Sequence, residues 1–163
     1  MDLAVRATHL IAAAVWAGGL VFLALAAGVA RSTLSEPERV EFFRRLGRRF
    51  LVVALLAAAV LAATGIDMAA DRLPDWDALF DTEWGRTIIA KTVLFATAIA
   101  LALVHALVLG PRIRRLRLAR LDAPADAGLE SRIRSLRVAS TVIQVVILSE
   151  TIAILVLAAD LVA

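Results

Sequence analysis

Four long apolar runs are the feature that most constrains how this chain can fold. They cover about residues 5–30, 50–71, 87–110 and 138–162, and no proline interrupts them. At a rise of 1.5 Å per residue, about 20 helical residues cross a hydrocarbon core of roughly 30 Å. Lipid offers the backbone no hydrogen bonds, so such runs must be helical. We therefore predict an all-α fold, an integral membrane four-transmembrane-helix bundle forming one domain over residues 1–163.

The composition agrees with a membrane protein. Hydrophobic residues make up 61% of the chain and the mean hydropathy is +0.85, which is too apolar for a soluble domain of this size. The chain has no cysteine. This excludes disulfides, cysteine zinc sites, covalently attached haem of the CxxCH type and thiolate-ligated haem.

The charged connections predict the orientation. Six arginines lie in residues 31–49 and eight in 111–137, whereas residues 71–86 hold five acidic residues against two arginines. By the positive-inside rule the first and third connections are cytoplasmic, so both termini face outward. The net charge is only +3. The arginines therefore indicate topology, and we expect no nucleic-acid partner.

Three local patterns predict where helices begin and end. The run Ser35-Glu36-Pro37-Glu38 predicts that the second helix begins inside the cytoplasm, near Pro37. Gly110-Pro111 is expected to end the third spanning helix or loosen its last turn. Aromatic residues at helical spacing predict a short helix at about 74–84, lying in the outer interface; they include Trp76, Phe80 and Trp84.

Ionisable side chains within the spans are candidate functional groups because burying them in lipid is costly. His9 lies about two turns from the outer end of the first helix. Neutral imidazole is a common ligand of metal ions and haem, although a histidine can also simply hydrogen-bond to a neighbouring helix. Met68 lies beside Asp67 at about the depth of His9, and either packs or acts as a soft ligand for iron or copper.

Lys91 and His105 lie fourteen residues apart on the third helix, about 21 Å along its axis. His9 and His105 therefore lie at opposite depths, which argues against one haem held by both in a straight bundle. Asp67 and Lys91 either extend to the interface or pair with each other. Glu150, about halfway along the fourth helix, either pairs with a cation such as Lys91 or has a proton-linked role.

Three stretches resemble the four-helix membrane domain of bacterial copper-resistance D proteins: HLIAAAVWAGGLVF, RRFLVVALLAAAVLAATGI and GRTIIAKTVLF. The residues that carry the likeness are His9, Trp16, Gly18, Gly19, Arg49, Phe50, Thr64, Gly65, Gly85, Arg86 and Lys91. The likeness covers roughly the first three helices and implies copper handling at the outer face of the inner membrane. His9 and Lys91 are also similar, more weakly, to the four-helix bacterial protoporphyrinogen oxidases, which implies b-type haem with His9 as a ligand.

The leading hypothesis from the sequence is a membrane protein that binds haem b, serving electron transfer or haem handling. His9 would be the axial ligand, Arg6, Arg86 and Lys91 would meet the propionates, and Trp16 would pack on the macrocycle. Glu150 would be a proton-linked neighbour of the haem. His105 is a separate candidate metal ligand.

A competing hypothesis is copper binding or copper permeation through His9, Met68 and acidic residues such as Asp67 and Asp71. With no cysteine, one internal methionine and two histidines, the chain offers few soft ligands for it. The sequence is also compatible with an enzyme that oxidises a porphyrinogen and with a scaffold that holds no cofactor.

The expected setting is the bacterial inner membrane, with the lipid bilayer as the main partner. Alanine-rich faces on the first two helices would also support a homodimer. The sequence leaves the redox partner and the existence of an enzymatic activity open.

Overall fold

A computed structural model describes residues 2–73, 77–122 and 126–160, and these residues form helices with short connections. The helices are α1 (Leu3–Thr33), α2 (Glu36–Ala70), α3 (Ala78–Asp81), α4 (Glu83–Val104), the π-helical η1 (His105–Leu109), α5 (Gly110–Asp122) and α6 (Ala127–Asp160). Four helical segments are long and apolar enough to cross a membrane: Leu3–Thr33, Glu36–Ala70, Glu83–Arg120 and Ala127–Ala159. The predicted all-α, four-helix transmembrane fold is confirmed.

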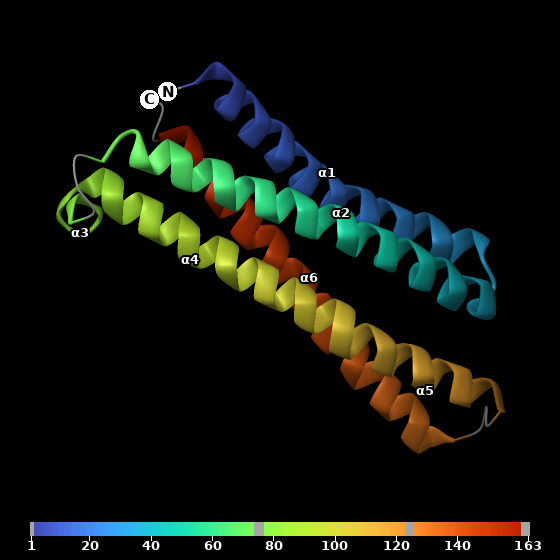
Figure 1. Ribbon diagram of the computed structural model, residues 1–163. Helices are drawn as coiled ribbons and strands as arrows, with labels where there is room; N and C mark the ends of the chain where they lie inside the picture. Colours follow the sequence, from blue (N-terminus) through green and yellow to red (C-terminus); the bar gives the residue numbers. More distant parts are fainter. Residues whose placement is uncertain (1, 74–76, 123–125, 161–163) are drawn as a thin grey trace.

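The bundle consists of two long hairpins packed side by side (Figure 1). One hairpin pairs α1 with α2, and the other pairs the continuous α4–η1–α5 segment with α6. α6 crosses behind α2 and α4 in this view, and α1 begins and α6 ends at the end of the bundle where α3 lies. Which end faces the cytoplasm stays a prediction from the arginine-rich connections.

The packing is inside-out relative to a water-soluble protein. Large apolar side chains such as Leu10, Leu25 and Val156 are 63–68% exposed on the outside of the bundle. The buried cluster consists mainly of alanines packed around two larger side chains; its members are Trp16, Ala54, Ala58, Ala98 and Ile147. Small interior residues let helix backbones approach closely, while the outer side chains meet lipid tails at no cost.

Gly19 on α1 leaves room for an aromatic ring of α2. A Cβ at Gly19 would overlap the ring of Phe50, whereas a Cβ at the preceding Gly18 would meet nothing within 4 Å. Of these two glycines, only Gly19 is required by the packing, because the absence of its side chain leaves room for the Phe50 ring of α2.

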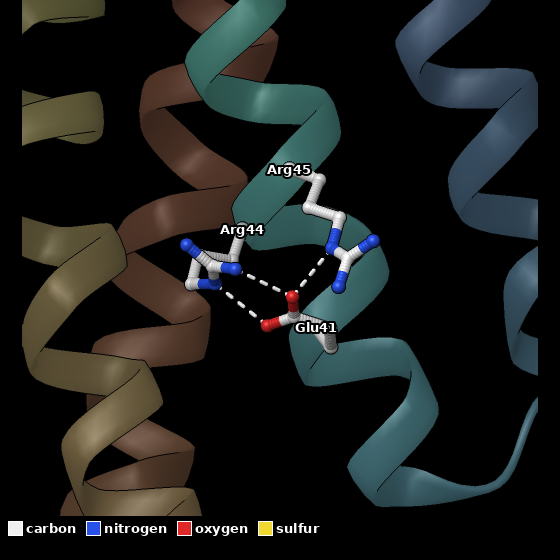
Figure 2. A network of polar contacts seen from close by, with 3 residues as sticks. All are labelled: Glu41, Arg44 and Arg45. Atoms are coloured by element: carbon white, nitrogen blue, oxygen red, sulfur yellow. Dashed lines mark hydrogen bonds and ion pairs between the residues drawn. The ribbon is translucent and has the colours of Figure 1, made fainter.

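α2 begins one residue before Pro37, close to its predicted start. The backbone N–H of Ser35 donates to the carboxylate of Glu38 at 2.9 Å, as in a capping box. One turn further on, Glu41 accepts hydrogen bonds from Arg44 and Arg45 (Figure 2). Glu41 lies in the charged part of α2, ahead of the apolar run, and the Arg44 and Arg45 bonds lower its pKa to about 2.

The third spanning helix does not end at Gly110-Pro111. It loosens into the π-helical turn η1 and then continues as α5 to Asp122. The N–H of Gly110 bonds to the carbonyl of His105, five residues earlier. Pro111 has no N–H to donate to Leu107 and its ring would crowd that carbonyl, so the wider turn accommodates it. The predicted loosening is confirmed and the predicted ending is wrong.

The aromatic segment at 74–84 differs from a single interfacial helix. α3 is short, and Thr82 caps the start of α4 by accepting from the N–H of Gly85 at 2.9 Å. Trp84 therefore belongs to α4, where the guanidinium of Arg72 lies 5.9 Å from its ring centre. Residues 74–76, which include Trp76, lie outside the described residues, as do residues 161–162 of the fourth run.

Candidate functional site

His9 lies in the third of the bundle where α1 begins, half-buried between α1 and α2. Its Nδ1 lies 2.7 Å from Oγ1 of Thr64 on α2. A Cβ added to the adjacent Gly65 would lie 3.7 Å from Cε1 of the ring, so this glycine leaves room beside the imidazole. The antiparallel packing of α1 and α2 thus fixes the ring between two residues of the facing helix.

The hydroxyl of Thr64 determines which nitrogen of His9 carries the proton. Thr64 donates its only hydrogen to the carbonyl of Val60, at 2.6 Å. It can then only accept from His9, so Nδ1 is the donor and Nε2 keeps a free lone pair in the neutral ring. A histidine whose other nitrogen is held in this way is oriented as a metal ligand would be.

Met68 lies one helical turn beyond Thr64 on the same face of α2 and is half-buried. Met68 is thus placed about one turn from His9, toward the end of the bundle where α1 begins. Lys91 on α4 is half-buried and close enough for its charge to act on His9. Arg6, Asp67 and Arg86 are exposed near the same end of the bundle.

Trp16 lies in the core. It is 6% exposed, its indole N–H donates to Oγ1 of Thr151 at 3.2 Å, and its ring meets Phe95 edge-on at 5.8 Å. One side chain of α1 thereby joins α4 and α6. This placement gives Trp16 a structural role in the interior, whereas the sequence hypothesis placed it against a macrocycle.

Glu150 faces α4 in the middle of the membrane. Its Oε1 lies 2.8 Å from Oγ1 of Thr97, and its Oε2 is buried with no hydrogen-bond partner among the described residues. The described ion pairs do not link Glu150 to Lys91. A hydroxyl of the neighbouring helix is therefore the contact that holds this carboxyl group.

His105 lies much deeper and its Nε2 is engaged. This nitrogen lies 2.9 Å from Oγ of Ser140 and 3.1 Å from the amide nitrogen of Gln144, both on α6. His105 is also the first residue of the π-helical turn. The ring is consequently fixed between η1 and α6 by two polar side chains of α6.

The two histidines belong to separate places in the bundle. His9 lies seven residues from Trp16, toward the end of the bundle where α1 begins, and Trp16 is level with Thr151. Gln144 lies seven residues from Thr151 in the opposite direction. At 1.5 Å per residue these steps add to about 21 Å along the axis. This agrees with the sequence argument that one haem iron does not bind both rings.

Across residues 2–73, 77–122 and 126–160, no three His, Cys, Asp or Glu side chains gather as they would for a preformed metal site. Among the described residues, the third of the bundle where α1 begins holds one imidazole, that of His9, and one thioether sulfur, that of Met68. Such a pair suits a soft ion that accepts few ligands, and Cu(I) is such an ion.

The sequence model of the family described as copper resistance protein D matches residues 44–158, more than half of the chain. The chain belongs to the copper resistance protein D family. Searches of curated proteins and of solved structures return no match. As a member of this family with four spanning helices, the chain is a multi-pass membrane protein of the copper-resistance type.

The matched region differs from the one that the motifs indicated. It begins within α2 and runs through most of α6, whereas the three motifs lie on α1, α2 and α4. The α1 residues His9 and Trp16 therefore lie outside the match, and α6 lies inside it. The family result supports the copper hypothesis from the sequence, while haem, iron and electron transfer gain no support.

Sequence reasoning missed the hydroxyl and amide partners of the charged and aromatic groups. The sequence does not predict the contact of His9 with Thr64 or that of Glu150 with Thr97. It also does not predict the contacts of His105 with Ser140 and of Trp16 with Thr151. A partial signal exists on α6, where Ser140 and Gln144 are spaced four residues apart within an apolar run.

Proposed function

We propose that this copper-resistance D protein binds a copper ion as its cargo in the outer third of the bundle, with His9 and Met68 as the protein donors. The Nδ1 contact of His9 with Thr64 carries the proposal, because it leaves Nε2 free to coordinate. Imidazole and thioether are the donor types that Cu(I) favours. The site would lie in the inner membrane of a bacterium, at the outward-facing end of the bundle.

The charged side chains around the site favour weak, reversible binding of copper. Lys91 acts electrostatically on His9, and a nearby ammonium opposes a bound cation. Asp67 is exposed close to Met68 and offers a carboxylate at the entrance. The donors would hold copper loosely enough to release it, as a transport or resistance protein requires.

The contacts around Trp16 also favour copper over haem. Its side chain packs against Thr151, Phe95 and the alanine-rich core. A porphyrin packed on this ring would have to displace that core. Copper needs no such space, since one imidazole and one thioether side chain can reach a single ion.

The direct test is Cu(I) binding to the purified full chain in detergent, in competition with a chromophoric Cu(I) chelator. Wild-type protein should take one copper per chain. His9→Ala should weaken binding at least about tenfold, and Met68→Leu should weaken it by a similar factor while keeping the side-chain volume.

His105→Ala is the matched control, because its ring is held by Ser140 and Gln144 and lies far from the outer donors. Its affinity for Cu(I) should equal that of the wild type. Equal affinity for wild type and His9→Ala would exclude this site. An absorption spectrum with a haem Soret band that disappears in His9→Ala would instead support the haem hypothesis.

A further inference from the structure

A stripe of arginines and small apolar residues runs along one exposed face of α6. Arg134, Arg137, Val138, Thr141 and Val142 line a shallow hollow of about 350 Å³. They share one helix face, because they are spaced three or four residues apart. Within the stripe, the arginines come first and the apolar and hydroxyl side chains follow.

This change in polarity coincides with the expected edge of the membrane. The fourth apolar run begins at Val138, so Arg134 and Arg137 lie at headgroup depth and Val142 about one turn inside the hydrocarbon. The hollow therefore opens toward lipid over its apolar part and toward the interface over its basic part.

The neighbouring residues leave an excess of positive charge. Arg120 bridges Glu36 on α2 and Glu130 on α6, so the carboxylate at the edge of the hollow, Glu130, is already paired. Arg117, on α5, lies within electrostatic reach of Arg137. Its Nε is buried and has no hydrogen-bond partner in the part of the chain that the structure describes. Guanidinium groups thus outnumber carboxylates around the hollow.

From the polarity of this stripe and the surplus of arginine, we propose that α6 carries a binding site for one anionic phospholipid. The phosphate of the headgroup would accept from Arg134 and Arg137, and an acyl chain would lie over Val138, Thr141 and Val142. Guanidinium groups bind phosphate oxygens through paired, charge-assisted hydrogen bonds, which neutral headgroups do not satisfy. Bound lipid would tie α6 to the headgroup layer beside α5, at the end of the bundle opposite the copper donors.

The test uses the full chain in a neutral detergent, with phosphatidylglycerol or phosphatidylcholine of identical acyl chains added at equal mole fractions. Native mass spectrometry would count bound lipids, and thermal unfolding would report stabilisation. We expect one phosphatidylglycerol to be retained and the melting temperature to rise, with phosphatidylcholine giving neither effect.

Two variants separate the site from general basicity. Arg134→Gln/Arg137→Gln should reduce phosphatidylglycerol affinity about thirtyfold, the equivalent of about 2 kcal/mol for two arginines at a membrane surface. Arg112→Gln/Arg115→Gln removes the same charge from exposed positions on α5 and should leave the affinity unchanged. Thr141→Trp, which fills the hollow without changing the charge, should also weaken binding.

Equal losses in the two arginine pairs would overturn the proposal, since lipid would then follow net charge alone. Equal retention of the two lipids would also overturn it. Inorganic phosphate that reproduced the full thermal shift would contradict the acyl contact and reduce the site to one for free anions.

Discussion

Nδ1 of His9 on α1 lies 2.7 Å from Oγ1 of Thr64 on α2, and the same hydroxyl donates to the carbonyl of Val60. The single hydroxyl hydrogen is therefore used within α2, and the imidazole must be the donor between the two helices. This relationship turns a histidine at a helix interface into one whose Nε2 is available to a ligand.

Thr64→Val should weaken Cu(I) binding about tenfold or more without preventing folding. Valine keeps the shape of threonine but removes the acceptor that fixes the His9 ring, and loss of such a supporting hydrogen bond typically costs about 10- to 100-fold in metal affinity. Thr92→Val is the control, because among the described residues the Thr92 hydroxyl bonds within its own helix, to the carbonyl of Ile88. Identical Cu(I) affinities in both variants would show that Thr64 does not position the ligand.

Lys91→Gln should strengthen Cu(I) binding. Removing an ammonium that acts electrostatically on His9 relieves a repulsion toward a bound cation. The haem hypothesis requires the opposite, since Lys91 would then hold a propionate and its loss would weaken the cofactor. Chelator competition and a haem absorption spectrum on the same sample distinguish the two results.

Gly85→Ala should destabilise the fold by about 1–3 kcal/mol, as expected for overpacking. A Cβ there would lie 2.5 Å from the carbonyl oxygens of Ala78 and Leu79, so α3 would have to lift away from the start of α4. Gly18→Ala is the matched control within a helix and meets nothing within 4 Å. It should be neutral or stabilising in a detergent unfolding titration, and a loss equal to that of Gly85→Ala would refute the steric explanation.

Thr151→Val should cost about 1–2 kcal/mol, because it leaves the buried indole N–H of Trp16 without its acceptor. Trp16→Phe should cost less in the Thr151→Val background than in the wild type, since no N–H is then left unpaired. A double-mutant cycle on unfolding free energies measures the coupling. Strict additivity would mean that the bond between α1 and α6 contributes nothing.

The carboxyl group of Glu41 should titrate with a midpoint near pH 2, well below its ordinary value of 4.5, because Arg44 and Arg45 hold its charged form. A lowered folded-state pKa means that any stabilisation is complete above pH 4.5 and is lost as the pH falls toward 2. Carboxyl-carbon NMR shifts measure the midpoint. Arg44→Gln/Arg45→Gln should return it to the ordinary value, and an unchanged midpoint would show that the two arginines are not the cause.

Sequence reasoning located the polar groups but not their partners. Periodicity alone places His9, His105 and Glu150 within spans and at different depths, since depth depends only on position along a helix. Which residue of another helix meets them depends on how the helices are rotated and paired. Thr64, Thr97 and Ser140 carry no special signal in a sequence where many hydroxyl residues face lipid or their own helix.

The helix ends show the same division. The sequence predicts the capping box at Ser35 and the disturbance that Pro111 imposes on the preceding turn, because both depend on neighbouring residues. It does not predict whether the third spanning helix stops at Pro111. The helix continues because α6 packs along α5 and because Arg120 bridges to Glu130, ten residues away, and to Glu36, 84 residues away in the sequence.

The apolar runs are sufficient to establish that four helices cross the membrane, because runs of this length without proline have no other stable state in lipid. The arrangement of the helices in the folded protein is needed to show that the core is built from alanine around Trp16, that Thr64 leaves Nε2 of His9 free, and that Glu150 meets Thr97. Lipid and the interior of the bundle are equally apolar, so the hydrophobic effect cannot favour one pairing of helices over another. Close packing and a few hydrogen bonds between helices select among them.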